Sequence, residues 1–252
     1  MKTAIITGAS VGLGQELARQ AAQVFPDIQC YWLIARREDK LRETAALLPD
    51  KQIRLLPLDL CAEESFSHLE QELAEQQPEV CLLVNNAGCG FLNPVGQGPL
   101  QEPLTMIDLN LRALTAVTHL ALPYMSRGGH IVNISSIASF CPNPRMTVYS
   151  AGKAYVSAFS RGLHEELRGQ GISVTAVCPG PMDTEFISLG HIKGQSPMFE
   201  KLPYCDPVQV AAGALRAASR GRAVYTPRFF YKLYRLLAKM LPQPLMIKFT
   251  RT

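Results

Sequence analysis

Three side chains in one stretch of the sequence, Ser136, Tyr149 and Lys153, are suited to moving a proton. Tyr149 and Lys153 stand four residues apart, a spacing that places two side chains on one face of a helix. A phenol titrates near ~10 in water and is a poor base at neutral pH, but a neighbouring ammonium lowers its pKa toward the working range. We therefore expect Lys153 to lower the pKa of Tyr149. A chance Y-x-x-x-K on an ordinary helix is the alternative reading.

A glycine-rich turn near the N-terminus predicts a nucleotide-binding site. Residues 3–7 have the pattern of a short buried strand, G-A-S-V-G-L-G follows at 8–14, and a helical pattern then runs to about Val24. Glycines let the backbone approach a pyrophosphate, and the helix N-terminus offers free N–H groups. A merely flexible turn is the alternative.

Two arginines follow the second predicted strand, which spans 30–35. Arg36 and Arg37 stand at its end, and the acidic residues Glu38 and Asp39 come only after them. In dinucleotide-binding folds an acidic residue here holds the ribose hydroxyls, whereas an arginine accommodates a 2′-phosphate. The pattern favours NADP(H), and solvated charges at the start of a helix are the alternative.

Strand and helix patterns alternate along the chain. Further strands are predicted at 53–58, 80–84, 130–134 and 172–177, and helices at 38–48, 63–76, 104–125 and from Tyr149 to about 168. This alternation predicts an α/β fold with a Rossmann-like, doubly wound parallel sheet of about seven strands, helices on both faces and a single domain. Asn110 lies inside a predicted helix, where its propensity is poor, so it is either buried in a polar role or solvated.

Composition limits the remaining possibilities. No apolar run reaches the roughly eighteen residues of a membrane span, and the chain opens on a strand pattern rather than a signal peptide, so we expect a cytoplasmic protein. The seven cysteines are dispersed without a C-x-x-C pair, and we expect no metal site.

Together these motifs resemble the short-chain dehydrogenase/reductase family, from Thr3 to about Ala218. The matching elements are T-G-A-S-V-G-L-G at 7–14, N-N-A-G at 85–88, Asn110, the strand-end serine, the Tyr149–Lys153 pair and P-G-x-x-x-T at 179–184. The resemblance implies that Tyr149 is the general acid or base and that Ser136, rather than Ser135, binds the substrate oxygen. It also implies that Lys153 holds the nicotinamide ribose and that Asn110 sustains a proton relay through water.

The resemblance also implies a set of cofactor-binding residues. They are Gly8, Ser10, Gly12, Leu13, Gly14, Arg36, Arg37, Asp59, Leu60, Asn86, Ala87, Gly88, Tyr149, Lys153, Pro179, Gly180, Met182 and Thr184. Many NADP(H)-dependent members carry a basic residue where this chain has Val11. The preference for NADP(H) therefore depends on Arg36, with Arg37 as a helper.

Apolar segments predict the kind of substrate. We expect a single domain at 1–227 that includes a substrate lid at about 185–205. The segments 89–95 and 139–148 are expected to form the other walls of the substrate pocket. Their apolar residues indicate a hydrophobic substrate, so the prediction is an enzyme that interconverts a ketone and a secondary alcohol of steroid, lipid or acyl type. A 3-oxoacyl thioester reductase served by an acidic carrier protein, or a non-catalytic dinucleotide-binding protein on the same fold, remains open.

The last part of the chain is basic. Nine of the 25 Lys and Arg residues follow Asp206, and no acidic residue does. We expect residues 228–252 to form an extension with a basic amphipathic helix at 228–241 that Pro242 and Pro244 stop. A membrane surface, another subunit, the substrate pocket and an acidic carrier protein all fit this helix. No nucleic-acid-binding motif is recognised in the sequence. The family resemblance implies a homodimer or homotetramer.

Overall fold

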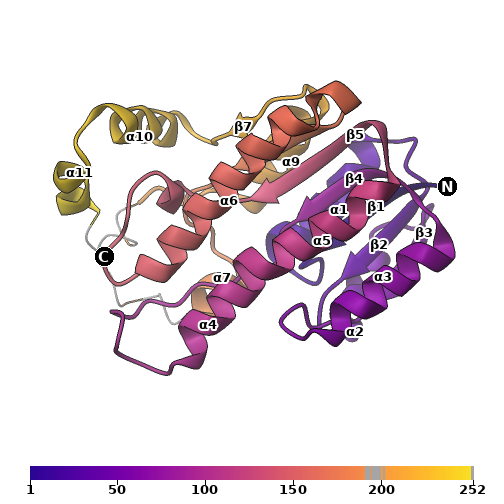
Figure 1. The fold of residues 1–252 in the computed structure, drawn as a ribbon, viewed down its shortest axis with the longest axis horizontal. Coiled ribbons are helices and arrows are strands. Elements are labelled where there is room, and N and C mark those ends of the chain that lie inside the picture. Colours follow the sequence, from indigo (N-terminus) through magenta and orange to yellow (C-terminus); the bar gives the residue numbers. More distant parts are fainter. Residues whose placement is uncertain (191–193, 195–199, 201, 251–252) are drawn as a thin grey trace.

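A parallel sheet organises the molecule. The computed structural model describes residues 1–190, 194, 200 and 202–250, and within them seven strands pair in the order β3-β2-β1-β4-β5-β6-β7 (Figure 1). The strands are β1 (Lys2–Thr7), β2 (Cys30–Ile34), β3 (Gln52–Leu56), β4 (Glu79–Asn85), β5 (Met125–Ile134), β6 (Ser173–Val177) and β7 (Val224–Tyr225). The predicted doubly wound α/β fold is confirmed. The strand order reverses between β1 and β4, so the carboxyl ends of these two strands border the crevice where such sheets bind ligands.

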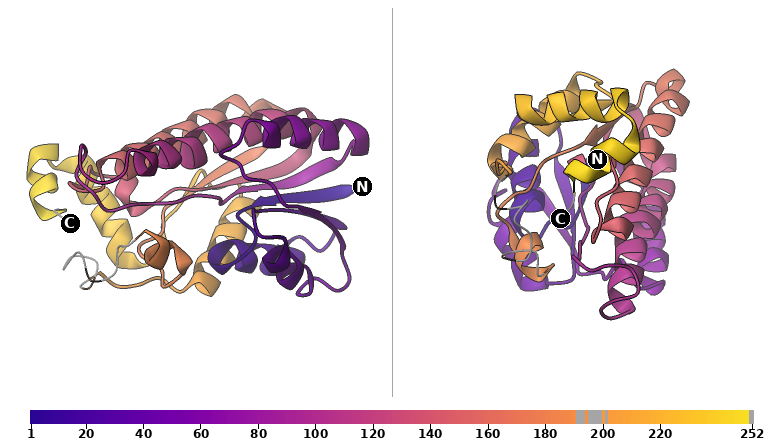
Figure 2. Two further views of the ribbon diagram at one scale, coloured as in Figure 1. Left: turned by 90° about the horizontal axis from the view of Figure 1, so that it is seen from below. Right: turned by 90° about the vertical axis from the view of Figure 1, so that its left-hand side faces the viewer.

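Helices cover both faces of the sheet (Figure 2). One face carries α1 (Gly12–Val24), α2 (Glu38–Ala45) and α9 (Pro207–Ser219), and the other carries α3 (Glu64–Gln76), α5 (Ala113–Ala121) and α6 (Thr147–Glu166). Because both faces are covered, the strands read as continuous apolar runs, and all five residues of β2 are buried.

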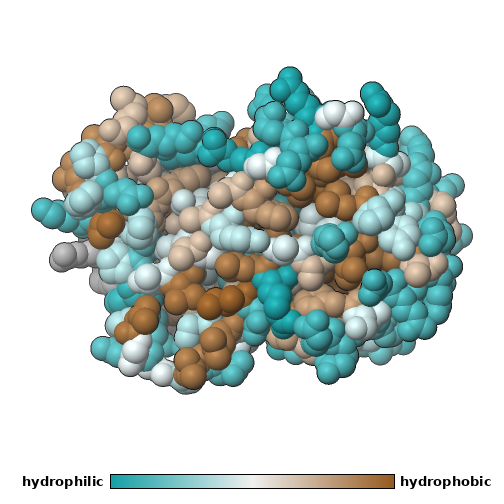
Figure 3. Space-filling model, in the orientation of Figure 1, coloured by the Kyte–Doolittle hydropathy of each residue, from teal (hydrophilic) through white to brown (hydrophobic). Residues whose placement is uncertain are grey.

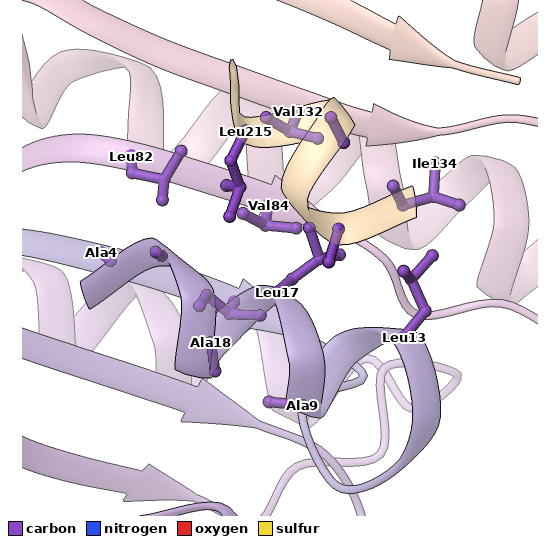
Figure 4. Close-up of a cluster of buried hydrophobic side chains, with 14 of the residues drawn as sticks. Ala4, Ala9, Leu13, Leu17, Ala18, Leu82, Val84, Val132, Ile134 and Leu215 are labelled. Carbon is purple, nitrogen blue, oxygen red and sulfur yellow. The ribbon is translucent and has the colours of Figure 1, made fainter. Parts of the chain in front are cut away.

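The core on the α1 side shows how the layers meet. Leu13 and Leu17 of α1 and Leu215 of α9 pack against Val84 and Val132 of the central strands (Figure 4). Helix α9, which the sequence analysis did not identify, begins at a capping residue: the Asp206 carboxylate accepts a hydrogen bond from the Val208 N–H at 3.0 Å.

The helix predicted at 104–125 is wrong in detail. Residues 101–121 form α4 (Gln101–Ile107), the π-helical segment η1 (Asp108–Arg112) and α5, and β5 already begins at Met125. The pairing of β5 with β4 shifts register between Val80 and Leu82, and Gly128 has a φ of 85°. This irregularity explains why the start of β5 looks like a turn in the sequence.

The C-terminal part forms two helices at the carboxyl edge of the sheet (Figure 1). The predicted amphipathic helix is α10 (Phe229–Met240), and it ends before Pro242. The prolines then begin a further helix, α11 (Gln243–Phe249), because proline fits the first turn, where no N–H partner is needed. Tyr231 of α10 is buried in the core on the α1 side. The domain boundary at residue 228 stays a prediction. Across the described ranges no helix is long and apolar enough to cross a membrane.

Candidate active site

The glycine-rich turn joins β1 to α1 at the crevice. Gly8 and Gly12 have φ values of 63° and 58°, in the left-handed region that favours glycine. The side-chain amide of Asn86 donates hydrogen bonds to the Thr7 and Gly8 carbonyls at 3.2 and 3.0 Å. Asn86 therefore braces the turn from the end of β4. The N–H groups at the start of α1 and the narrow space around the glycines fit a pyrophosphate.

The Thr7 hydroxyl adds a second brace between the two strand ends. It accepts hydrogen bonds from the N–H groups of Asn86 and Ala87 at 3.0 and 3.1 Å, and it lies 3.3 Å from the Val84 carbonyl, to which it donates. The sequence analysis matched Thr7 to the motif but gave it no role. Its position as the last residue of a buried strand was the available signal.

Asn110 is buried, which decides between the two alternatives left by the sequence. Its side chain accepts a hydrogen bond from the Cys89 N–H at 3.0 Å and donates one to the Cys89 carbonyl at 2.8 Å. It lies on η1, and π-helical turns inside α-helices occur frequently at functional sites. A Cβ on Gly88 would lie 2.7 Å from the Asn110 oxygen and 3.5 Å from the Lys153 ammonium nitrogen, so these three residues converge.

Ser136 and Tyr149 meet beside this group. Ser136 stands two residues after the end of β5, and its hydroxyl accepts from the Ala138 N–H at 3.1 Å. Its hydrogen-bonding interaction with Tyr149 lowers the pKa of that phenol. Ser135 instead donates to the Lys153 carbonyl at 2.9 Å, which ties the strand end to α6. The structure thus brings Ser136, rather than Ser135, to the tyrosine.

The prediction that the pKa of Tyr149 is lowered is wrong in this structure. Burial raises the pKa of Tyr149 to about 12, and the hydrogen bond with Ser136 offsets only part of that rise. Burial also lowers the pKa of Lys153 to about 8. The Lys153 ammonium donates to the Ile134 carbonyl at 2.9 Å and lies 5.7 Å from the centroid of the Tyr149 ring. With its pKa raised by burial, Tyr149 is a protonated phenol at neutral pH and is suited to donating its proton.

An apolar wall faces Tyr149. Its ring packs against Phe186 of α7 (Glu185–Leu189), with ring centroids 5.7 Å apart. Most of the surrounding cluster comes from the three segments that the sequence predicts as walls, and Met106 and Ala138 join it from elsewhere. The members from the predicted walls include Phe91, Leu92, Met146, Val148, Phe186 and Ile187. The part of the predicted lid at 191–193, 195–199 and 201 lies outside the described residues.

The two arginines after β2 have different surroundings. Both are exposed, and Arg37 forms an ion pair with Glu185 at 2.6 Å. Arg36 makes no ion pair with any residue that the structure describes. Arg36 is therefore the cation available to a 2′-phosphate, while Arg37 is engaged with the start of α7.

Asp59 and Leu60, expected near the adenine, follow β3. The Asp59 carboxylate accepts a hydrogen bond from the Cys61 N–H at 3.0 Å, and Leu60 is buried. Ser10 and Leu13 of the glycine turn are also buried. Within the described ranges no three His, Cys, Asp or Glu side chains group in a way that could hold a metal ion.

The loop with the P-G-x-x-x-T motif closes the crevice from the other side. The Pro179 carbonyl accepts from the Ile137 N–H at 3.0 Å, and a Cβ on Gly12 would lie 3.3 Å from the Thr184 methyl carbon. A Cβ on Gly180 would overlap the ring of Tyr231, whose hydroxyl donates to the Pro203 carbonyl at 2.7 Å. The sequence analysis missed this role of Tyr231, although its place opposite the apolar stripe of α10 was a signal.

The sheet and the glycine-rich turn together indicate which class of protein this is. A doubly wound parallel sheet with a glycine turn at its switch point belongs to the nucleotide-binding α/β proteins. Residues 2–189 match the short chain dehydrogenase family, and the chain belongs to that family of oxidoreductases.

Individual relatives agree with this assignment. The chain is 37% identical over 187 residues to sulfoacetaldehyde reductase 2 of Chromohalobacter salexigens, which covers 72% of this chain and 73% of the relative. It superposes on a short-chain dehydrogenase from Sphingobium yanoikuyae in complex with NADPH with a TM-score of 0.81 and 30% identity, covering 98% and 95% of the two chains. It also superposes on the bulky-bulky ketone specific alcohol dehydrogenase from Comamonas testosteroni with a TM-score of 0.76 and 28% identity, covering 98% and 94%.

The buried amide of Asn110 gives a first testable prediction. Asn110→Ala leaves the Cys89 N–H and carbonyl without their partners, so we expect the free energy of unfolding to fall by about 2 kcal/mol in urea denaturation. The matched control is Asn93→Ala, because Asn93 is exposed and its side-chain amide donates to the half-buried Glu102 carboxylate. We expect the control to change stability by less than about 0.5 kcal/mol. Equal stability of the two variants would contradict a supporting role for Asn110.

Proposed function

We propose that the protein is an NADP(H)-dependent oxidoreductase that interconverts a ketone and a secondary alcohol on a hydrophobic substrate. The observation that carries this proposal is the convergence of Ser136, a protonated Tyr149 and Lys153 in front of an apolar wall. Asn110 lies in the same group. A non-catalytic dinucleotide-binding protein has no need to keep all four side chains together.

The proposed reduction follows from the position of these groups. The Tyr149 hydroxyl donates its proton to the carbonyl oxygen, and the Ser136 hydroxyl donates a hydrogen bond to the same oxygen. Donors aimed at an oxygen that gains negative charge stabilise the transition state. When bound, NADPH would supply the hydride that the carbonyl carbon takes up, so that the product would be the alcohol. The buried Lys153 and Asn110 provide the route by which Tyr149 regains a proton through water.

The proposed cofactor-binding residues surround the crevice. The glycine turn at 8–14 would hold the pyrophosphate, Asp59 and Leu60 the adenine, and residues 86–88 the adenosine ribose side. Lys153 would hold the nicotinamide ribose, and the loop at 179–184 would hold the carboxamide and phosphates. The Sphingobium relative, which was solved with NADPH, supports the choice of NADP(H).

The size and polarity of the substrate are inferred from the wall around Tyr149. Aromatic and aliphatic side chains from three segments face the phenol, which favours a bulky apolar ketone over a small charged aldehyde. The Comamonas relative, named for bulky-bulky ketones, supports this choice. A homodimer or homotetramer, usual for the family, stays a prediction.

A substrate screen tests the proposed function. The purified protein is incubated with NADPH and, separately, with bulky ketones, steroids, 3-oxoacyl thioesters and sulfoacetaldehyde, and the oxidation of NADPH is followed by absorbance. We expect turnover with the apolar ketones at a kcat/KM well above that for sulfoacetaldehyde. Turnover restricted to the small aldehyde would refute the substrate class, and NADPH binding without any turnover would favour the non-catalytic alternative.

The preference for NADP(H) gives a second prediction. Arg36→Asp removes the cation available to the 2′-phosphate and introduces a repelling charge, so we expect kcat/KM with NADPH to fall by about 10- to 100-fold while that with NADH rises or stays unchanged. The matched control is Arg42→Asp, which makes the same charge change on the exposed surface of α2, where Arg42 pairs with Glu38. A ratio of NADPH to NADH activity that is the same in both variants would move the 2′-phosphate site elsewhere.

A further inference from the structure

Helix α10 turns its apolar side chains away from the protein. Phe229, Leu233, Leu236 and Met240 recur at helical spacing along one face, and all four are exposed; Phe229 is 80% and Met240 71% accessible to solvent. We call these four residues the outer stripe of α10. An amphipathic helix ordinarily buries such a stripe, so its exposure along the full length of the helix needs a reason.

A different face holds α10 on the protein. Tyr231 is fully buried against Gly180, and the ring of Tyr234 lies 6.0 Å from that of Phe140. These tyrosines lie roughly opposite the outer stripe, since each residue advances a helix by about 100°. The attachment of α10 therefore does not use the outer stripe, which remains available for something else.

A row of positive charges borders the outer stripe. Arg228, Lys232, Arg235 and Lys239 precede the four stripe residues by one position each. The last three lie within α10 and form a parallel row on the adjacent flank, and Arg228 directly precedes the helix. None of these four side chains forms an ion pair with a described residue. No acidic residue occurs after Asp206. We call these four residues the basic row of α10.

We propose that α10 docks on an anionic membrane surface, with the outer stripe in the acyl boundary and the basic row at the phosphates. Apolar residues along one face with lysines and arginines beside them are typical of helices that lie in the plane of a membrane. The long basic side chains can keep their charges at the phosphates while their stems stay in the apolar layer. Anionic lipid attracts each such charge, which matches the basic row.

The charges and the shape of this surface favour a lipid over a second copy of the chain. Two copies that met through α10 would bring two basic rows together without acidic residues between them. The stripe is about 18 Å long, from one end of the 12-residue helix to the other, so it suits a plane. Leu241 at the end of α10 and Leu245 of α11 are also exposed. Figure 3 shows hydrophobic and hydrophilic surface side by side at the upper left, where α10 and α11 lie in Figure 1.

The position of α10 fixes how the docked protein is oriented. Helices α10 and α11 lie at the carboxyl edge of the sheet, the edge that carries the crevice (Figures 1 and 2). Docking through α10 therefore brings this end of the molecule close to the membrane. The orientation follows from the fold and is independent of the proposed activity.

The test uses the full-length protein and vesicles. Sedimentation is measured with vesicles of phosphatidylcholine alone and of phosphatidylcholine mixed with phosphatidylglycerol. We expect binding to the anionic vesicles that weakens as salt is added, and little binding to the neutral ones. Removing residues from 228 onward is unsuitable because it also removes Tyr231 from the core, so point substitutions on exposed positions are used.

Matched pairs of variants separate α10 from the general properties of the chain. Lys232→Glu with Lys239→Glu is expected to lower partitioning onto the anionic vesicles by about tenfold or more. Its control, Arg220→Glu with Arg222→Glu, makes the same change of charge in the loop after α9 and is expected to stay within about twofold of the unmodified protein. Leu233→Ser is expected to weaken binding, unlike Leu47→Ser, although the two leucines are 44% and 43% exposed.

The proposal is overturned by three results. The first is no sedimentation with anionic vesicles at low salt, even if an acidic protein binds the same helix. The second is equal loss of binding in the α10 variants and their controls. The third is a change from dimer to monomer in light scattering for Lys232→Glu with Lys239→Glu while vesicle binding is unchanged, which would make α10 a contact between copies.

Discussion

Tyr149→Phe is expected to lower kcat for ketone reduction by roughly 10²- to 10⁴-fold while leaving the affinity for NADPH within about twofold. The substitution removes only the hydroxyl, so the ring keeps its contact with Phe186. The donated proton and the hydrogen bond with Ser136 are lost, and no other described phenol takes part in the cluster around this residue except the half-buried Tyr204. Steady-state kinetics gives kcat, and a fluorescence titration with NADPH gives the affinity.

Tyr155→Phe is the matched control for this experiment. Tyr155 lies on the same helix, and its exposed hydroxyl makes a 2.8 Å hydrogen bond with Thr115, so this variant also loses one hydroxyl contact of a helix α6 tyrosine. We expect its kcat to stay within about twofold of the unmodified protein, because surface changes away from a site have small effects. Retained turnover in Tyr149→Phe, or an equal loss in both variants, would refute the role of Tyr149 as proton donor.

The fold was predictable from the sequence, and the candidate site residues lie together in it, because both depend on local patterns. Buried strands, glycines at a strand-to-helix turn and polar residues at strand ends are each readable within a few positions. Since parallel strands end at one edge, such residues must come close together. The convergence of Asn110, Ser136, Tyr149 and Lys153 is therefore a consequence of the alternating order of strands and helices.

The direction of the pKa shift at Tyr149 could not be predicted in the same way. Spacing on a helix shows which charge is near, but desolvation depends on atoms from distant segments, here the backbone at Gly90 and the ring of Phe186. These neighbours exclude water from the phenol, and this burial raises its pKa. The ion pair of Arg37 with Glu185 was hidden for a similar reason, since it joins residues that are 148 positions apart.

The two faces of α10 show a second limit. The sequence pattern identified a basic amphipathic helix, but periodicity does not say which face meets the protein. The apolar face would ordinarily be expected to point inward. Instead the fit of Tyr231 against Gly180 decides the orientation, and this contact joins residues from two separate parts of the chain.

Gly14→Ala is expected to weaken NADPH binding on the order of 10²-fold, because a small displacement at a binding turn has an effect of this size. A Cβ at this position would overlap the Gly8 carbonyl oxygen and lie 2.6 Å from the Asn86 amide nitrogen. Both are parts of the brace between β1 and β4, and neither can move without opening the turn. We also expect the free energy of unfolding to fall by about 1–3 kcal/mol, as for other overpacked sites.

Gly162→Ala provides the control, since it adds the same methyl group in helix α6 at a position where no atom lies within 4 Å of the added Cβ. Because alanine is the better helix former, this variant is expected to be more stable by about 0.5–1 kcal/mol and to bind NADPH normally. Titration with NADPH gives the affinity of each variant, and urea denaturation gives the free energy of unfolding of each. Normal NADPH affinity in Gly14→Ala would show that the turn tolerates displacement, and the pyrophosphate site would then have to lie away from residues 8–14.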